Sequence, residues 1–407
     1  MCIVSSPGRG GLGIKIPRLK RTADSPIQRL EAPLRVRLSI DAMTPLVTAG
    51  DRVKSGSLVA ESSGNAHWYR CSHAPLLSTV SANGHSTTGQ HENGNGSARS
   101  LELLIEEDST PLGRCDHYHP AELDPEEIRD IARRAGLLGM GGGMFPTYVK
   151  LSPTDPIDWV IINGCESEPY LTCDHRVLLE HRDEVECGMR LAMQAVGATQ
   201  GTIVTSKDDY LDGYEPRLVQ KVLNRQVPKG GRPSHVGVVV LNVQSAQALH
   251  RAVCEQRPLV DRIVTVDGNT IQRPGNYVVP LGTEIRHVLD ICGVDWDQAQ
   301  RVIAGGPIMG SPVQPETVVT AGTGGILALS GDEISEPNHN PCIRCGNCQE
   351  VCPMALPSRQ LLRRPTDQLL ECIECGMCQF SCPAQQPILQ EIRKAKSHLR
   401  DANDLNS

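Results

Sequence analysis

Two short segments near the C-terminal end of the sequence carry the same cysteine spacing, and no other feature constrains the fold as strongly. The pattern C-x2-C-x2-C-x3-C-P spans residues 342–353 and recurs over residues 372–383. Three cysteines at successive three-residue steps wrap a tight loop around one face of a bound group, and the following turn carries the fourth cysteine away. The chain must therefore bring two such loops together.

This spacing is the one that proteins use for paired [4Fe–4S] clusters, in which the fourth cysteine of each run ligates the other cluster. We predict that cluster 1 is held by Cys342, Cys345, Cys348 and Cys382. Cluster 2 is then held by Cys372, Cys375, Cys378 and Cys352. The alternative is a pair of structural zinc sites, but tetrahedral zinc needs only four ligands and no trailing Cys-Pro. Paired clusters indicate a relay of single electrons.

The composition fits an intracellular metalloprotein and excludes several classes. The chain has 407 residues, a net charge of −7 and 16 cysteines, eight of them within residues 342–382. The mild acidity argues against nucleic-acid binding. With no run of about 18 apolar residues and no apolar leader at the start, we expect neither a spanning helix nor a signal peptide. Cys187, Cys254 and Cys292 lie in helical patterns and are predicted to be core residues.

The first third of the chain predicts an irregular arm followed by a small β domain. Residues 1–35 have little periodicity, whereas residues 36–112 contain short alternating runs separated by turns. The predicted strands are 36–40, 57–60 and 77–80. Residues 83–98 are polar and rich in glycine, which predicts a surface loop or the flexible tip of a hairpin.

Residues 113–257 alternate between helical and strand patterns, which predicts an α/β domain with a mostly parallel sheet. Its first helix begins with a capping box at Asp124 and Glu127 and ends before Gly136. The predicted strands are 159–162, 202–205 and 236–241, and the helical patterns cover 175–195, 215–224 and 245–256.

The last two regions are a mixed-β segment and the cysteine module. Residues 258–334 contain strand patterns and a short helix near 283–291, and residues 335–407 carry both cysteine motifs. A basic terminal helix over 386–400 includes Arg393, Lys394 and Lys396. It is either a solvated face or a surface that docks to acidic lipids or to a partner.

Polar residues gather where a ligand would bind in such a sheet. Residues 139–147 form a glycine-rich loop, and Lys150 follows it closely. The loop departs from the dinucleotide fingerprint, because Met144 replaces the last glycine and a helix precedes it. It is either a plain turn or a cradle in which a phosphate or a flavin ring approaches backbone amides. Two predicted strands end in Asn163-Gly-Cys-Glu-Ser-Glu and in Asn242-Val-Gln-Ser, where open α/β sheets bind ligands.

Four segments together with the cysteine tail resemble the flavin-carrying subunit of NADH dehydrogenase complexes and, more closely, the family of the subunit designated C in Rnf electron-transport complexes. The segments are GMGGGMFPTYVK, INGCESEPYLTCDHR, YLDGYE and VGVVVLNVQS. The resemblance covers residues 36–396 and implies a multidomain α+β protein. Its parts would be a biotinyl/lipoyl-like β-sandwich, an FMN/NADH-binding α/β domain, a β-grasp ligand-binding domain and a two-cluster ferredoxin-like helical module.

The resemblance also implies an oxidoreductase that exchanges hydride between NAD(H) and FMN and relays electrons through two clusters. The positions that match the family's flavin contacts are Gly139, Gly141, Gly142, Lys150, Asn163, Glu166, Ser167, Gly213, Asn242 and Ser245. Those that match its nicotinamide contacts are Phe145, Glu168 and Tyr210.

The partners implied are the other subunits of a membrane-bound, ion-translocating complex, among them an iron–sulfur subunit that interacts with ferredoxin. The chain would lie at the cytoplasmic face of a bacterial inner membrane and contact the membrane through those partners. Two alternatives remain. One is a cobalamin reductase-like flavin and iron–sulfur protein, and the other is a relay that has kept its clusters but lost its flavin.

Overall fold

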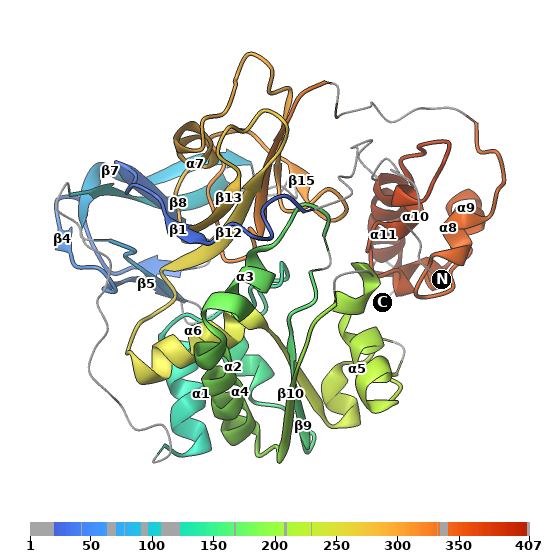
Figure 1. The fold of residues 1–407 in the computed structure, drawn as a ribbon, viewed down its shortest axis with the longest axis horizontal. Helices are drawn as coiled ribbons and strands as arrows, with labels where there is room; N and C mark the ends of the chain where they lie inside the picture. Colours follow the sequence, from blue (N-terminus) through green and yellow to red (C-terminus); the bar gives the residue numbers. More distant parts are fainter. Residues whose placement is uncertain are drawn as a thin grey trace.

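The computed structural model describes residues 20–41, 43–62, 71–76, 78–90, 97–106, 123–166, 168–206, 210–228, 230–331, 333 and 341–404. For residues 82–90, 97–98, 210–211 and 400–404 it describes the backbone alone. Over these residues the chain is a mixed α+β protein of several parts (Figure 1), as the sequence predicts. No helix in these ranges combines the length and the apolar character needed to cross a bilayer.

The N-terminal part is a β unit of two small sheets around one apolar core, which confirms the all-β prediction. One sheet has the antiparallel order β2-β8-β7-β4, and the other has the order β3-β5-β6. Alternate residues of β2 point inward, so Val36 and Leu38 join the core. The strands are β2 (Arg35–Ser39), β3 (Met43–Pro45), β4 (Arg52–Val53), β5 (Leu58–Ser62), β6 (Cys71–His73), β7 (Ser78–Gln90) and β8 (Ser97–Ile105).

The glycine-rich stretch of this unit forms strands that run well into the segment predicted as a loop. Strand β7 continues to Gln90, which pairs with Ser97 at the start of β8. The hairpin alternative is therefore the better description, and the loop prediction is wrong for residues 83–90. Backbone N–H and C=O groups form the ladder whatever the side chains are, so polar composition alone does not prevent a strand.

The central part contains the predicted parallel sheet, with β9 in the middle of the order β10-β9-β11. Val160, Ile161 and Ile162 of β9 are all buried, as expected for a strand covered on both faces. The capping box at Asp124 and Glu127 is present. The elements are α1 (Pro125–Arg134), α2 (Thr147–Lys150), β9 (Trp159–Asn163), α3 (Cys173–Glu180), α4 (Arg182–Val196), β10 (Gln200–Val204), η2 (Tyr210–Gly213), α5 (Glu215–Leu223), η3 (Pro233–Val236), β11 (Val238–Asn242) and α6 (Val243–Cys254).

The third part is a six-stranded mixed sheet in the order β1-β13-β12-β16-β14-β15, with helix α7 packed against it. Strand β1 comes from the N-terminal arm and pairs in parallel with β13, so the arm is not wholly irregular. A three-residue strand stabilised by a partner 249 positions later leaves no local pattern to detect. The elements are β1 (Ile27–Arg29), β12 (Asp261–Asp267), β13 (Gly275–Pro280), α7 (Ile285–Ile291), β14 (Arg301–Ala304), β15 (Ser311–Pro312) and β16 (Gly325–Leu329).

The C-terminal module is small and helical, and its two halves repeat one backbone geometry. Non-glycine residues with positive φ occur as the pairs Arg344/Glu374 and Ala355/Gln385, in which the second member lies 30 positions after the first. Gly346 and Gly376 form a third such pair. The elements are α8 (Asn347–Glu350), α9 (Ser358–Arg363), η4 (Asp367–Glu371), α10 (Met377–Phe380) and α11 (Ile388–Asp404). In Figure 1 the module lies to one side of the sheets, near α5.

Of the three scattered cysteines predicted to be core residues, only Cys292 is fully buried, at 1% exposure. Cys187 in α4 and Cys254 in α6 are only partly buried, and their thiols face each other. The helical pattern located these two residues correctly, but it did not show that both lie where the two helices meet near the surface.

Candidate functional site

A cavity of about 1520 Å³ lies at the carboxyl ends of β9 and β11, between the central sheet and the six-stranded sheet. This is the edge at which open α/β sheets bind ligands. The predicted site residues that line it are Gly139, Gly141, Gly142, Phe145, Lys150, Asn163, Glu166, Glu168, Gly213, Asn242 and Ser245. Ser167 and the side chain of Tyr210 lie outside the described residues.

Hydrogen bonds close the base of the glycine-rich loop, and its tip faces the cavity. The backbone N–H of Gly139 donates to the carbonyl of Phe145 at 2.8 Å, and the hydroxyl of Ser245 accepts from Met140 N–H at 2.9 Å. A Cβ added to Gly142 or Gly143 would meet no atom within 4 Å, so both residues border open space. Gly142 has φ +99°, which favours glycine. The loop therefore presents bare backbone to a ligand, which fits a flavin or a phosphate.

The two strand ends supply asparagines that organise the floor of the cavity. Asn163 Nδ2 donates to the carbonyl of Gly213 at 2.9 Å and joins the β9 end to the 3-10 turn η2. Asn242 caps α6 through its side-chain oxygen and donates from Nδ2 to Asp174 at 2.5 Å. Because β9 and β11 are parallel and in register, Asn163 and Asn242 lie side by side.

Glu166 and Asp174 form a close pair of carboxyl groups at this floor. Burial, together with the charge of Asp174, raises the pKa of Glu166 to about 7. Burial also raises the pKa of Asp174. Glu166 accepts from the N–H groups of Asp174 and His175 at the start of α3, at 2.8 and 3.0 Å. The pair can therefore hold a proton near neutral pH.

Lys20 supplies a cation beneath this pair. Its Nζ donates to the carbonyl of Leu171 at 2.8 Å and lies 3.4 Å from the carbonyl of Glu166. Burial lowers the pKa of Lys20, and the nearby carboxylates oppose that shift. The arm, which the sequence predicts as irregular, thus brings a charged group to the site.

Glu168 joins the site to the six-stranded sheet. Its two carboxylate oxygens accept from the backbone N–H groups of Ile308 and Met309 at 2.9 and 2.6 Å. Burial raises its pKa to about 7. A Cβ at Gly306 would come within 2.4 Å of the carboxylate, so only glycine fits there. Glu168 therefore fixes the 306–309 loop against the cavity.

Two further contacts shape the cavity wall. Lys150 forms an ion pair with Glu215 at 2.5 Å, so its charge is already matched within the chain. Phe145 faces the guanidinium of Arg232, whose carbon lies 5.6 Å from the ring centre. The hydroxyl of Thr147 is buried and has no hydrogen-bond partner among the described residues. Thr147 also lines the cavity.

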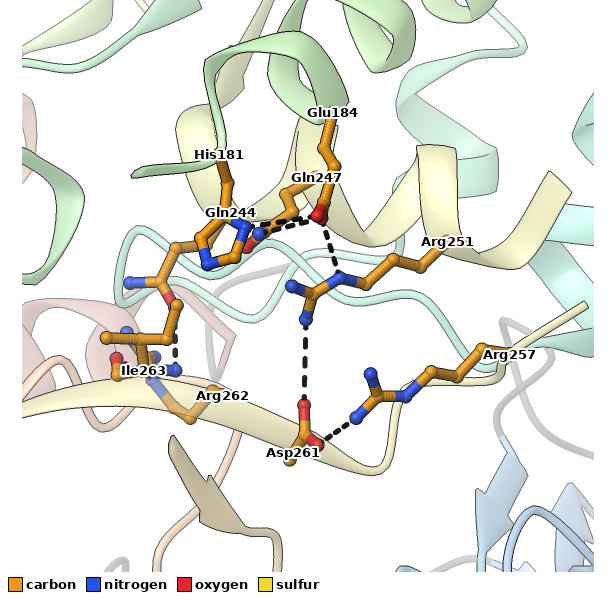
Figure 2. A network of polar contacts seen from close by, with 9 residues as sticks. All are labelled: His181, Glu184, Gln244, Gln247, Arg251, Arg257, Asp261, Arg262 and Ile263. Atoms are coloured by element: carbon orange, nitrogen blue, oxygen red, sulfur yellow. Dashed lines mark hydrogen bonds and ion pairs between the residues drawn. The ribbon is translucent and has the colours of Figure 1, made fainter. Parts of the chain in front are cut away.

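Behind the floor, Gln244 links the carboxyl pair to strand β12, as Figure 2 shows in part. Its Nε2 donates to Asp174 at 2.9 Å, and its Oε1 accepts from the N–H of Ile263 at 3.0 Å. The neighbouring Arg262 is 2% exposed and bonds to the carbonyl of Ala321. Burial lowers the pKa of Arg262. These contacts place a buried cation and a fixed amide next to the acidic floor.

The rest of the network in Figure 2 ties α4 and α6 to β12. Glu184 accepts from Gln247 and from Arg251, each at 2.9 Å. Arg251 also lies 4.0 Å from Asp261, which pairs with Arg257. This network holds the two helices and the strand as one support for the cavity.

The eight motif cysteines lie in two groups of four. Burial raises the pKa of Cys348, and the nearby thiols of Cys345, Cys382 and Cys342 raise it further. Burial likewise raises the pKa of Cys378, to which Cys375, Cys372 and Cys352 add. The fourth cysteine of each run thus lies with the other run's triplet.

Backbone donors also approach these thiols. Leu356 N–H lies 3.3 Å from the sulfur of Cys352, and Gln386 N–H lies 3.5 Å from that of Cys382. The two contacts are equivalent in the repeat. Such N–H groups stabilise the thiolate ligands of iron–sulfur clusters, so both groups of cysteines fit a [4Fe–4S] cluster.

One of the two groups of cysteines, the one that contains Cys352 and Cys375, lies against the cavity wall. Tyr214 lines the cavity, and its hydroxyl lies 3.8 Å from the sulfur of Met354, which follows Cys352 closely in the chain. Burial raises the pKa of Tyr214, and the charge of Cys375 adds to it. A Cβ at Gly376 would come within 2.8 Å of the carbonyl of Ile308, in the loop that Glu168 holds.

The basic terminal helix is only partly a solvated face. Lys396 is 5% exposed and donates to the carbonyl of Cys372 at 2.9 Å and to Glu374 at 2.5 Å. Arg393 also pairs with Glu374, at 3.2 Å. Two of the three basic residues named from the sequence therefore bind within the module beside a cysteine motif, and Lys394 is exposed.

Sequence reasoning did not single out Lys20, Asp174, Gln244, Arg262 or Gly306. Asp174 was within reach, because it follows the acidic strand end by a few residues and begins a helix. Gln244 was also within reach, because it lies in the polar run at the end of β11. Lys20, Arg262 and Gly306 come from segments that carry no recognisable motif and reach the cavity only through the fold.

Comparison with known families finds three matching models, each over one part of the chain. They are described as the Nuo51 FMN-binding domain over residues 132–209, the SLBB domain over residues 263–312 and the 4Fe-4S dicluster domain over residues 334–383. The first covers the glycine loop and the acidic strand end, and the last contains all eight motif cysteines.

Several curated relatives match most of the chain, and each is the subunit designated C of its complex. That of the proton-translocating ferredoxin:NAD(+) oxidoreductase complex of Clostridium ljungdahlii is 33% identical, over 83% of this chain and 80% of the relative. That of the ion-translocating oxidoreductase complex of Rhodobacter capsulatus is 32% identical, over 84% and 72%. That of the Na(+)-translocating ferredoxin:NAD(+) oxidoreductase complex of Acetobacterium woodii is 31% identical, over 84% of each chain.

Proposed function

The chain belongs to the family of the subunit designated C in ion-translocating ferredoxin:NAD(+) oxidoreductase complexes, and on that basis we propose how its residues divide the work. It is an oxidoreductase subunit that acts on NAD(H) with FMN and two [4Fe–4S] clusters, as part of a complex with other subunits. FMN, when bound, supplies the change between hydride transfer and single-electron transfer.

One observation carries the proposal: the glycine-lined cavity and one group of cluster cysteines share a wall. Tyr214 and the 306–309 loop each contact the cavity on one side and the cysteine module on the other. A flavin in the cavity would therefore lie next to an electron acceptor without any rearrangement of the chain.

Within the cavity, we assign the flavin to the glycine loop and the two strand ends. Gly141 and Gly142 allow close approach of a ring, and Asn163 and Asn242 are held at the cavity floor by hydrogen bonds to Gly213 and Asp174. Phe145 lines the cavity from the glycine-rich loop, and Glu168 lines it next to the six-stranded sheet. We assign the nicotinamide to this part of the cavity. The Glu166–Asp174 pair could hold a proton at the floor of the cavity when the flavin is bound.

For electron transfer, we order the two clusters by burial. The group with Cys375 and Cys378 lies at the cavity wall, with Cys378 buried. The group with Cys345 is farther out, because Cys345 is exposed and the adjacent Ile343 is 65% exposed. Electrons would pass between the cavity and cluster 2, then cluster 1, then a partner that docks at Ile343.

The domains are assigned on the same basis. We assign residues 1–35 to the arm, 36–112 to a lipoyl-like β domain, 113–257 to the FMN/NADH domain, 258–334 to a β-grasp domain and 335–407 to the two-cluster module. Strand β1 (Ile27–Arg29) belongs structurally with the β-grasp domain. We place the chain at the cytoplasmic face of a bacterial inner membrane, bound through partner subunits, one of which is an iron–sulfur subunit that meets ferredoxin.

The test is anaerobic purification with iron, sulfide and flavin quantified together, followed by titration with NADH. The proposal expects about eight irons per chain, one flavin that NADH bleaches, and a low-temperature paramagnetic signal after reduction. Iron without flavin would leave a simple relay, and binding and reduction of a corrinoid by the isolated protein would favour the cobalamin reductase alternative.

A further inference from the structure

A second set of metal-ligand side chains lies away from the cavity and from both cysteine motifs. Cys187 of α4 and His250 and Cys254 of α6 place their ligand atoms within 4.8 Å of one another. His250 and Cys254 are four residues apart on one helix, so both project from the same face. Cys187 completes the set from the neighbouring helix.

The spacing of the two sulfurs fits a shared metal ion. Their separation is 3.9 Å. A tetrahedral ion with metal–sulfur bonds of about 2.3 Å holds two thiolates roughly 3.8 Å apart, whereas a disulfide needs about 2.05 Å. The thiols thus already stand at the separation that a zinc ion imposes.

The histidine is oriented as a metal ligand usually is. Its Nε2 lies 3.8 Å from a carboxylate oxygen of Glu255, which is 8% exposed. Its Nδ1 is buried and has no hydrogen-bond partner among the described residues. A ligand histidine typically directs one ring nitrogen to a carboxylate and the other to the metal. Nδ1 of His250 is the nitrogen left to bind.

The two helices hold these side chains firmly in place. A Cβ at Gly188 would clash with the carbonyl of Ala246, so α4 and α6 are in direct contact one residue after Cys187. Arg251, next to His250, is tied to Glu184 of α4 at 2.9 Å (Figure 2). The ligands therefore do not need to be assembled on binding, which reduces the ordering cost.

We propose that Cys187, His250 and Cys254 bind a zinc ion that joins α4 to α6, with water in the fourth position. Two sulfurs and one imidazole nitrogen suit Zn²⁺, which accepts tetrahedral N/S coordination. Cys254 lies nine residues from Ser245 of the cavity, about 14 Å along the helix. The proposed site is therefore separate from the flavin site.

The test measures the zinc content of the whole chain. The protein is produced in cells grown with added zinc and is purified anaerobically with its clusters and flavin. We expect about one zinc per chain, with a zinc-edge X-ray absorption spectrum showing two sulfurs near 2.3 Å and lighter ligands at about 2.0–2.1 Å. The zinc edge is specific to that element, so cluster iron does not interfere.

The variants Cys187→Ser and Cys254→Ser should each lose most of the zinc while iron and flavin stay at wild-type levels, which shows that the protein still folds. Cys292→Ala removes a buried thiol elsewhere and should keep the zinc. His250→Cys offers a third thiolate and should keep it as well. Wild-type protein without zinc, zinc that persists in the Cys187→Ser/Cys254→Ser double variant, or a Cys187–Cys254 disulfide in anaerobic protein would each overturn the proposal.

Discussion

The cysteine module and the cavity proposed to bind the flavin are built in opposite ways. All eight module cysteines lie between residues 342 and 382, and a backbone geometry repeated every 30 residues positions both groups. The cavity draws most of its lining from residues 139 to 324, and Lys20 supports it from the arm. A site of the first kind is encoded locally, whereas a site of the second kind exists only when several sheets come together.

The sharpest test of this contrast is to remove one cluster ligand. Cys375→Ser should lower the iron content from about eight to about four per chain and abolish NADH-driven reduction of an external one-electron acceptor. Bleaching of the flavin by NADH should continue, because the cavity is built from other segments. Iron analysis and stopped-flow spectroscopy measure both effects, with Cys292→Ala as the matched thiol control. Loss of flavin bleaching in Cys375→Ser would show that the two regions are not independent.

A pH test addresses the cavity alone. Burial raises the pKa of Glu168 from 4.5 to about 7. The protonated side chain therefore contributes fully to the free energy of unfolding below pH 4.5, and this contribution is lost as the pH rises through about 7. The shift corresponds to about 3 kcal/mol. The melting temperature of the central domain, followed by flavin release, should fall between pH 5 and pH 8, and it should fall less in Glu168→Gln.

The control for this pH test is Glu316→Gln. Glu316 is exposed, and its hydrogen bond with Arg286 holds its pKa below the usual range, so this variant should keep the wild-type drop. If the melting temperature falls equally in Glu168→Gln and in the wild type, Glu168 is not the cause of the pH dependence.

The arm can be tested for its share in the cavity. Lys20→Met removes the charged donor beneath Glu166 and should weaken flavin binding roughly tenfold, since a hydrogen bond from a charged group contributes about 1.5 kcal/mol. Arg21→Met is the matched control, because Arg21 pairs with Asp267 outside the cavity lining. Flavin fluorescence titration measures both. Equal weakening of flavin binding in the two variants would mean that the arm supports the cavity only by packing against the sheets, and that the charge of Lys20 makes no separate contribution.

The smallest expected effect concerns the module. Lys396→Met removes a buried cation that donates to the carbonyl of Cys372, so the potential of cluster 2 should become more negative by on the order of tens of millivolts. Lys394→Met, in the same turn but exposed, should leave the potential unchanged. Redox titration followed by paramagnetic resonance separates the two clusters. A shift in cluster 1 instead would reverse their proposed assignment.

Much of the fold was predictable because its patterns are local. The strands β9, β10 and β11 and the capped helix α1 follow the expected runs within a few residues. Strand β1 was missed, because it pairs with the distant strand β13 and three residues carry no periodicity. The loop prediction at residues 83–90 was wrong, because a backbone ladder does not depend on apolar side chains.

The candidate site divides in the same way. Asn163, Glu166 and Asn242 were found because strand ends are recognisable in the sequence. Arg262 and Gly306 were not, since what matters about them is which atoms they meet. Cys187 and Cys254 illustrate the limit best, because helical periodicity treats each as a buried residue and only the packing of α4 on α6 brings their thiols together.

The sequence by itself determined the two cysteine loops, the parallel central sheet and the polar ends of its strands, because each depends on residues close together in the chain. The tertiary structure alone decided that Lys20 reaches the acidic floor and that the 306–309 loop meets Glu168. It also decided that one cysteine group borders the cavity and that the other faces outward. Those arrangements depend on contacts between residues far apart in the chain, and such contacts are set by how whole sheets and helices pack.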